Sequence, residues 1–192
     1  MSHLLDQHPQ IIAIAGPNGA GKTTFYNSHL RNCAMRFVNA DILAKTLHLD
    51  AYDAAKVAGN LREELLTQRE SFVFETVFSD PIGDKISFLT RANGLGYTVV
   101  LCFIGISSAE VSDQRVAMRT SQGGHDVPRD KLVARFPRVL ANLREAIRRL
   151  PHVWIFDNDD LGTPFRKVAV FRDGTATETI EPIPAWLQAL IP

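Results

Sequence analysis

The sequence predicts an α/β fold in which a mainly parallel sheet lies between two layers of helices. Short apolar runs alternate along the 192-residue chain with segments of helical periodicity, which is typical of such a fold. The run at 97–106 is apolar on both faces, as expected of a central parallel strand. The first apolar run, at 11–15, leads directly into a glycine-rich motif of the G-x-x-x-x-G-K-[ST] type. These observations predict one domain over residues 1–192, a three-layer sandwich of the P-loop NTPase class.

The remaining segments continue this alternation to the end of the chain. We expect further strands at 36–41, 71–76 and 152–156, and a C-terminal β-hairpin of 167–172 with 175–180. We expect helices that begin at Lys22 and Ile42, and others at 51–69, 82–91, about 108–120, 129–150 and 184–190. Pro137 predicts a kink in the longest helix. Because ligands of open α/β sheets bind beyond the carboxyl ends of the strands, we look for functional residues there.

The motif after the first strand is typical of a loop that holds the phosphates of a nucleotide. It comprises Gly16-Pro17-Asn18-Gly19-Ala20-Gly21-Lys22-Thr23, and Thr24 extends the predicted ATP-binding set into the helix. Backbone N–H groups and Lys22 would hold the β- and γ-phosphates, and the Thr23 hydroxyl would be a ligand of Mg²⁺. A glycine-rich turn without a ligand is the alternative, but it needs no Lys beside a Thr. The sequence lacks the Asn-Lys-x-Asp motif that reads guanine, so we expect ATP rather than GTP.

Two carboxylates stand at the predicted ends of the second and third strands. Asp41 would face the bound γ-phosphate and could accept the proton of an attacking hydroxyl, although an Asp here could also cap the helix that begins at Ile42. Glu75 would bind substrate or Mg²⁺, with a solvent-exposed charge at a strand end as the alternative. Thr76 would assist as a hydroxyl donor. The pair predicts an acceptor side next to the phosphate loop.

Arginines around a glycine-rich segment predict a lid over the site, at about 115–136. Arg115 and Arg119 are four residues apart and therefore share a helix face, and Arg135 follows on the next helix. Arginines that close over a triphosphate would stabilise the charge being transferred, while a solvated helix face is the alternative. His125, within the glycine-rich segment, is the histidine that we would test for contact with substrate.

The charge composition excludes a general attraction to nucleic acid or to an anionic membrane. Lys plus Arg equal Asp plus Glu at 21 each. The stretch 129–149 is locally basic, with seven basic residues against two acidic ones, which leaves a nucleotide-dependent switch or a nucleic-acid-associated ATPase as the alternative function. That stretch lacks interleaved exposed aromatic residues, and its apolar stripe is needed for the core, so we do not expect a nucleic-acid partner.

The cysteines and the apolar runs predict a cytoplasmic protein. Cys33 and Cys102 lie in no motif spacing and are expected to be reduced and buried. The N-terminal residues lack the basic and long apolar regions of a signal peptide, and no apolar run is long enough to span a bilayer. We therefore expect no contact with a membrane.

An ordered set of motifs over residues 10 to about 160 resembles the zeta toxin family of P-loop kinases. The set comprises the phosphate loop with Thr24-Phe25, Asn39-Ala40-Asp41, Phe74-Glu75-Thr76, Gly96-Tyr97, Arg115-Val116, Gly123-Gly124-His125-Asp126-Val127-Pro128 and Arg135-Phe136. The resemblance implies a kinase that uses ATP and Mg²⁺ to phosphorylate a hydroxyl of UDP-N-acetylglucosamine. It further implies the toxin of a toxin–antitoxin pair, with an antitoxin protein as partner.

The resemblance also implies roles for single residues. Lys22 would hold phosphate, Asp41 would be the catalytic base, Glu75 and Thr76 would hold substrate, and Arg115 would contact the triphosphate. The chain looks shorter than the well-known toxins, with little room for an extra substrate-binding insertion, and no fused antitoxin segment precedes the loop. The resemblance implies UDP-N-acetylglucosamine as acceptor, and these departures leave another nucleotide sugar or a small hydroxyl compound as the alternative.

Overall fold

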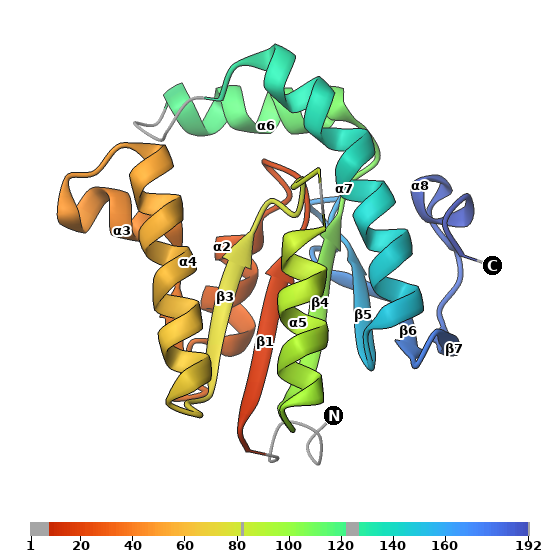
Figure 1. Ribbon diagram of the computed structural model, residues 1–192. Helices are drawn as coiled ribbons and strands as arrows, with labels where there is room; N and C mark the ends of the chain where they lie inside the picture. Colours follow the sequence, from red (N-terminus) through yellow and green to blue (C-terminus); the bar gives the residue numbers. More distant parts are fainter. Residues whose placement is uncertain (1–7, 82, 122–126, 192) are drawn as a thin grey trace.

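A sheet of seven strands forms the centre of the computed structural model, which describes residues 8–81, 83–121 and 127–191 (Figure 1). The strands follow the order β2-β3-β1-β4-β5-β6-β7, and the first four neighbouring pairs are parallel while the last two are antiparallel. The α/β class, the mainly parallel sheet and the C-terminal hairpin are therefore confirmed. The strands are β1 (Gln10–Ala15), β2 (Arg36–Val38), β3 (Phe72–Thr76), β4 (Thr98–Gly105), β5 (His152–Asp157), β6 (Arg166–Arg172) and β7 (Thr175–Thr179).

Helices cover both faces of the sheet and its upper edge. They are α2 (Lys22–Phe25), the π-helix η1 (Tyr26–Leu30), α3 (Ala40–Leu47), α4 (Ala51–Thr67), α5 (Asp84–Gly94), α6 (Ala109–Ser121), α7 (Arg129–Arg149) and α8 (Ala185–Gln188). Figure 1 shows α4, α5 and α7 on one face of the sheet and α2 on the other. It also shows α6 and the start of α7 above the carboxyl ends of the parallel strands, where a lid was predicted.

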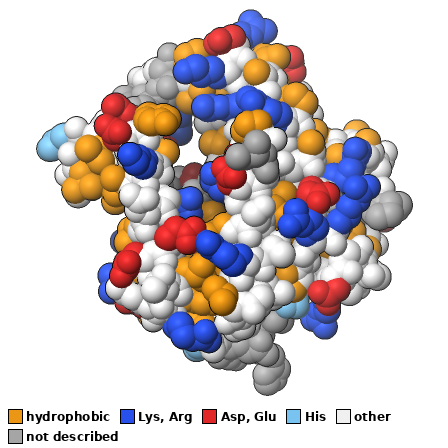
Figure 2. All heavy atoms as spheres, in the orientation of Figure 1, with side chains coloured by type: hydrophobic (Ala, Val, Ile, Leu, Met, Phe, Trp, Pro, Cys, Tyr) orange, Lys and Arg blue, Asp and Glu red, His pale blue; other side chains and the backbone are white. Residues whose placement is uncertain are grey.

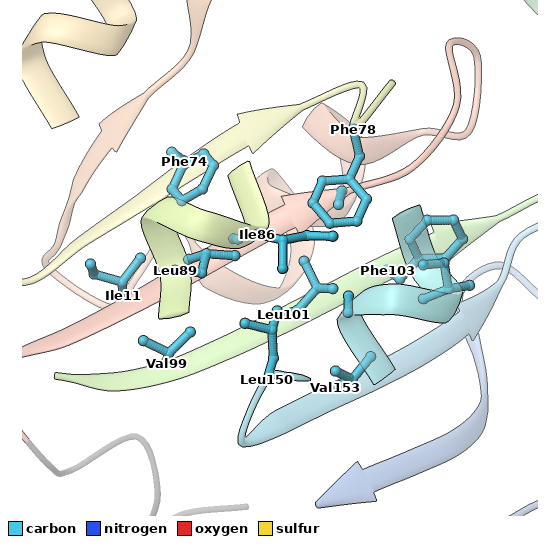
Figure 3. Packing of buried hydrophobic residues seen from close by; sticks show 14 of the residues in the cluster. Ile11, Phe74, Phe78, Ile86, Leu89, Val99, Leu101, Phe103, Leu150 and Val153 are labelled. Carbon is cyan, nitrogen blue, oxygen red and sulfur yellow. The ribbon is translucent and has the colours of Figure 1, made fainter. Parts of the chain in front are cut away.

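Two apolar clusters hold the layers together. One joins the sheet to α4, α5, α7 and α8, and the other joins it to α2 and η1. Successive side chains of β1 point to opposite faces of the sheet, so Ile11 packs in the first cluster and Ile12 in the second. Figure 3 shows Ile86 and Leu89 of α5 packed over Leu101 of β4. Because both of its faces are covered, β1 is buried along its whole length and holds the phosphate loop at a fixed position.

The structure corrects the expected link between the second strand and its helix. β2 ends at Val38, and Asp41 lies in the first turn of α3 instead of at the strand end. The cap of α3 is Asn39, whose side-chain oxygen accepts a hydrogen bond from the backbone N–H of Ile42 (3.0 Å). The expectation that Asp41 could be this cap is wrong, because Asn39 already satisfies the N–H in question.

The helix after β3 also begins later than expected. α5 starts at Asp84, because Gly83 before it adopts a left-handed φ of 72° that a helix cannot contain. Residue 82, where we expected the helix to start, lies outside the described ranges. The connection between β3 and α5 is consequently longer than the sequence indicates, and its residues 77–81 form one wall of the site described below.

The two cysteines differ in their surroundings. Cys102 is buried in β4, Cys33 is half-buried just after η1, and both thiols are free. Burial raises the pKa of Cys102 to about 12. Separately, none of the helices within the described ranges has both the length and the apolar character needed to cross a membrane.

Candidate active site

The phosphate loop lies at the carboxyl end of β1, between β3 and β4. Gly16 has a φ of 147°, and a Cβ atom there would lie 2.1 Å from the carbonyl oxygen of Ile104, so a side chain at this position is impossible without moving β4. Lys22 closes the loop by donating from Nζ to the carbonyl of Pro17 (2.9 Å). The loop therefore has a defined shape before any nucleotide binds.

Two side chains hold the loop from behind, and neither was singled out from the sequence. Ser112 of α6 donates from Oγ to the carbonyl of Asn18 (2.7 Å). Asn158, directly after β5 and only 4% exposed, donates from Nδ2 to the carbonyl of Ala20 (2.8 Å). Both bonds use carbonyl oxygens and leave the backbone N–H groups of the loop for phosphate. The position of Asn158 after a buried strand is the signal that could have identified it.

Three charged side chains act on the buried ammonium group of Lys22. Burial lowers the pKa of Lys22, the negative charges of Glu75 and Asp41 oppose that shift, and the positive charge of Arg119 adds to it. Glu75 Oε1 lies 4.0 Å from Lys22 Nζ. The structure thus brings together four residues that were predicted from separate parts of the sequence.

Glu75 is the centre of a hydrogen-bond network at the end of β3. Its Oε2 accepts from the Thr23 hydroxyl (2.8 Å) and from Nδ2 of Asn39 (2.7 Å), and its side chain is 13% exposed. The alternative of a solvated charge at a strand end therefore does not apply. Asn39, which the sequence analysis had not assigned a role, joins the start of α3 to this carboxylate.

The oxygens of Thr23 and Glu75 suit Mg²⁺. This ion prefers oxygen ligands and is usually held by one or two carboxylates together with the phosphates of a bound nucleotide. Across the described ranges, no group of three or more His, Cys, Asp and Glu side chains is placed to hold a metal ion by itself. A magnesium ion at this site would therefore take its remaining ligands from nucleotide phosphates and water.

The two arginines of α6 occupy different surroundings. Arg115 donates from its two terminal guanidinium nitrogens to the carbonyls of Asn158 (2.7 Å) and Asp159 (2.8 Å), which places the group behind the phosphate loop. Arg119 lies close enough to Lys22 for its charge to affect the pKa of that residue. Of the two, Arg119 is the one whose charge acts on Lys22 of the phosphate loop.

A cavity of about 470 Å³ opens beside the phosphate loop on the side of α3 and β3. Figure 2 shows this face of the molecule hollowed between α4 and α7, with charged side chains around the rim. The cavity is lined by Asn39, Ala40, Asp41, Ala55, Ala58, Arg62, Glu75, Thr76, Val77, Phe78, Ser79, Asp80, Pro81, Lys85, Arg135 and Arg138. The predicted acceptor residues Asp41, Glu75 and Thr76 therefore share one cavity with Arg135.

The remaining predicted residues are Thr24 and His125, and Thr76 has one further contact. Thr24 is exposed on α2, and its carbonyl accepts a hydrogen bond from the Ser28 hydroxyl (2.8 Å). His125 and the glycines before it lie outside the described residues. The Thr76 hydroxyl oxygen accepts a bond from the backbone N–H of Phe78 (3.2 Å), which leaves its proton for another acceptor.

The basic residues of α7 are divided among several surroundings. Arg135 and Arg138 line the cavity, Arg144 donates to the carbonyl of Ala189 (2.8 Å), and two others lie within 4.0 Å of Glu145. A nucleic-acid surface would need its cations on one accessible face. This arrangement therefore gives the alternative function little support.

Comparisons with known proteins agree with the fold and the loop. The model of a family described as an AAA domain matches residues 11–143, and no match was found among curated proteins. A chain in the AvrRxo1-ORF1:-ORF2 complex with ATP superposes with a TM-score of 0.72 at 19% identity, covering 97% of this chain and 64% of that one. This chain thus spans less than two thirds of the length of that relative.

Two smaller relatives superpose as well. A chain of the PezAT toxin–antitoxin system of Streptococcus pneumoniae gives a TM-score of 0.60 at 16% identity, covering 97% of this chain and 78% of that one. A gluconokinase from Sinorhizobium meliloti gives 0.50 at 20% identity, with coverages of 79% and 83%. At these identities the likeness shows a shared P-loop kinase-like fold. The matched family model is the AAA domain and not the zeta toxin.

Proposed function

We propose that this chain, which belongs to the AAA domain family, is an ATP- and Mg²⁺-dependent kinase that phosphorylates a hydroxyl of a small molecule. The observation that carries the proposal is the position of Asp41 and Glu75 between the phosphate loop and a cavity of about 470 Å³. A nucleotide switch needs no cavity on the γ-phosphate side of its loop, whereas a kinase needs one for its acceptor.

On the donor side, the phosphate loop and Lys22 bind the β- and γ-phosphates of ATP. The positive charge of Arg119 adds to that of Lys22 near the group being transferred, and Arg135 supplies a second arginine of the lid, whereas Arg115 is held behind the loop. The Thr23 hydroxyl and the Glu75 carboxylate hold Mg²⁺, which neutralises charge that develops on the phosphates.

On the acceptor side, Asp41 is the general base. Its carboxylate takes the proton of the acceptor hydroxyl as the oxygen forms a bond to the γ-phosphorus, and the bond from that phosphorus to the β-γ bridging oxygen breaks to release ADP. The capping bond of Asn39 holds the turn that carries Asp41, and a second bond from the same side chain holds Glu75. Glu75 and Thr76 are then placed to contact the acceptor, with His125 as a further contact.

The charges of the cavity favour an anionic acceptor. Arg62, Lys85, Arg135 and Arg138 line it, and within the described ranges none of them has a carboxylate partner at 4.0 Å or less. Unpaired cations around a cavity are suited to bind phosphate. A nucleotide sugar such as UDP-N-acetylglucosamine carries both a diphosphate and free hydroxyls, so we propose this class.

The biological setting that we propose is a cytoplasmic toxin with a protein antitoxin, acting as a single kinase domain. Support comes from the AvrRxo1-ORF1:-ORF2 complex and the PezAT toxin–antitoxin system, in which chains of this fold occur with a partner. Expression of the wild type should then inhibit growth, while expression of the Asp41→Asn variant should not. Equal growth of the two strains at equal protein levels would contradict the toxin assignment.

The biochemical test uses purified protein, ATP, Mg²⁺ and a panel of UDP-sugars. We expect a UDP-sugar whose mass has increased by one phosphoryl group, formed together with an equal amount of ADP and measured by mass spectrometry. The Asp41→Asn variant is the control for a contaminating kinase. Release of ADP without any phosphorylated panel member would count against a nucleotide-sugar kinase. Salt-sensitive binding of RNA or DNA would then favour the alternative ATPase.

A further inference from the structure

One carboxylate oxygen in the wall of the acceptor cavity lacks a hydrogen-bond partner. Oδ1 of Asp80 is buried, and no donor within the described ranges reaches it. The other oxygen, Oδ2, accepts a long bond from the backbone N–H of Lys85 (3.4 Å). A buried carboxylate oxygen without a donor is unfavourable, so natural proteins rarely retain one without a reason. Asp80 lines the cavity, so rotation of its carboxyl group can turn this oxygen toward a donor on a bound ligand.

The backbone around Asp80 is fixed, which keeps the carboxylate in the wall of the cavity. Asn142 of α7 donates from Nδ2 to the carbonyls of both Phe78 (2.9 Å) and Asp80 (3.0 Å). Phe78 has a φ of 64°, which is unusual for a bulky residue. Its ring is 1% exposed and, as Figure 3 shows, points into the apolar cluster beside Ile86. The cluster and Asn142 thus hold the loop in a conformation that it would not adopt alone.

The cation of Arg62, on which the charge of Asp80 acts, does not satisfy the unpaired oxygen. The guanidinium carbon of Arg62 lies 5.0 Å from the centre of the Phe74 ring and 5.8 Å from that of Phe88, which holds the group over two aromatic faces. The charge of Asp80 acts on Arg62, where it opposes the lowering of the pKa by burial. Within the described residues, however, the two side chains form no ion pair at 4.0 Å or less. The two groups therefore remain available to a ligand between them.

We propose that Asp80 is a specificity-determining residue whose carboxylate, turned toward the cavity, accepts a hydrogen bond from a second hydroxyl or N–H group of the acceptor. This proposal rests on the proposed function, because it assumes that the acceptor occupies this cavity. The chemical class that follows is a compound with at least two donor groups, one phosphorylated near Asp41 and another bound at Asp80. A site built to pair with a donor rejects an analogue that lacks it, because the buried carboxylate then stays unpaired.

The kinetic test compares Asp80→Asn with Asp84→Asn, a matched control that makes the same chemical change on an exposed residue outside the cavity. UDP-N-acetylglucosamine and UDP-glucose are the acceptors, each beside analogues in which one hydroxyl is replaced by hydrogen. For Asp80→Asn we expect the KM for the full acceptor to rise about tenfold or more. The KM for ATP should stay within about twofold of the wild type, as should both constants in the control.

The analogue that loses the hydroxyl bound at Asp80 should be a poor substrate of the wild type and no worse a substrate of Asp80→Asn. That loss of discrimination is a result that a merely structural role of Asp80 would not produce. An unchanged acceptor KM, with the discrimination among analogues intact, overturns the proposal.

A melting measurement without any ligand tests the same idea independently of the acceptor. If Oδ1 is reserved for a ligand, Asp80→Asn should melt at the wild-type temperature or above it, as Asp84→Asn should. A midpoint lowered by about 3 °C or more relative to that control would assign Asp80 a structural role and overturn the proposal. If no UDP-sugar is phosphorylated by the wild type, the proposed function fails and the melting comparison alone decides the role of Asp80.

Discussion

The donor half and the acceptor half of the site are built in different ways. The donor half is one uninterrupted loop, whose shape is set by glycines with left-handed φ angles, 147° at Gly16, 72° at Gly19 and 88° at Gly21. The acceptor half is a cavity lined by side chains from α3, α4, β3, α5 and α7 and from the loop 77–81. Phosphate binding therefore depends on local backbone geometry, whereas the choice of acceptor depends on contacts between distant segments.

Because the two halves are built differently, substitutions in one half can leave the other half unchanged. Substitutions in the cavity can alter the acceptor without disturbing the phosphate loop, because Ser112 and Asn158 hold the loop from the opposite side. Within the described ranges, Glu75 joins the two halves directly, through its hydrogen bond with Thr23 and its ion pair with Lys22. Variants on either side of this connection should therefore separate the affinity for ATP from the affinity for the acceptor.

The largest effect is expected from Lys22→Ala in the donor half. The variant loses the ammonium group that contacts phosphate, so turnover should fall by about a thousandfold or more, and ATP should bind measurably more weakly in calorimetry. Because burial lowers the pKa of Lys22, its charged form disfavours folding, which offsets part of the stability lost with its bond to Pro17. Lys56→Ala, an exposed change on α4, is the control. An active Lys22→Ala enzyme would contradict the donor assignment.

A smaller loss confined to the chemical step is expected from Asp41→Asn in the acceptor half. Removal of the general base should lower kcat by about a hundredfold to ten-thousandfold, while calorimetry should show ATP bound with nearly unchanged affinity. Asp53→Asn, on an exposed carboxylate in the first turn of α4, should retain full activity. Wild-type kcat in the Asp41→Asn enzyme would falsify the base assignment.

Two substitutions at position 39 can separate the two roles of Asn39, the cap of α3 and the hydrogen bond to Glu75. Asn39→Ala removes both the cap of α3 and the bond to Glu75, so the free energy of unfolding should fall by about 1 kcal/mol and turnover should decline. Asn39→Ser retains a capping oxygen but is too short for Glu75, so it should keep most of the stability and share the loss of turnover. If Ser restored activity as well, Asn39 would act through the helix cap alone.

The donor half could be predicted from the sequence almost completely, and the acceptor half only in part. The motif at 16–23 requires no tertiary information, since its glycines and the Lys-Thr pair are adjacent in the chain. Asp41 and Glu75 could be recognised because the first closely follows a strand and the second lies at the end of one. Asn39 was overlooked because the second strand looked three residues longer than it is. The sequence could not identify Arg62 and Asp80 as parts of one site. They line the same cavity because Asn142 of a distant helix holds the loop that carries Asp80.

The smallest effect is expected far from both halves, at His152 where β5 begins. Burial lowers the pKa of His152 from its ordinary 6.5, and the charge of Arg172 lowers it further, while Asp173 opposes the shift. Between the lowered pKa and 6.5 the unfolded chain binds more protons than the folded one. The free energy of unfolding should therefore fall as the pH falls through this range, and the contribution of His152 should be fully present above pH 6.5. His152→Gln should reduce this acid sensitivity in melting curves, with kcat unchanged at neutral pH.

The unequal burial of the two cysteines makes the natural sequence convenient for spectroscopy. Thiol-reactive dyes attack the thiolate, and with a pKa of about 12 and no access to solvent Cys102 does not supply one at neutral pH. Cys33 is half-buried and follows the helix that begins at the phosphate loop, with its backbone N–H bonded to the carbonyl of Leu30 (3.0 Å). A single fluorophore on Cys33 would therefore report nucleotide binding to the folded wild-type protein, without an engineered labelling site.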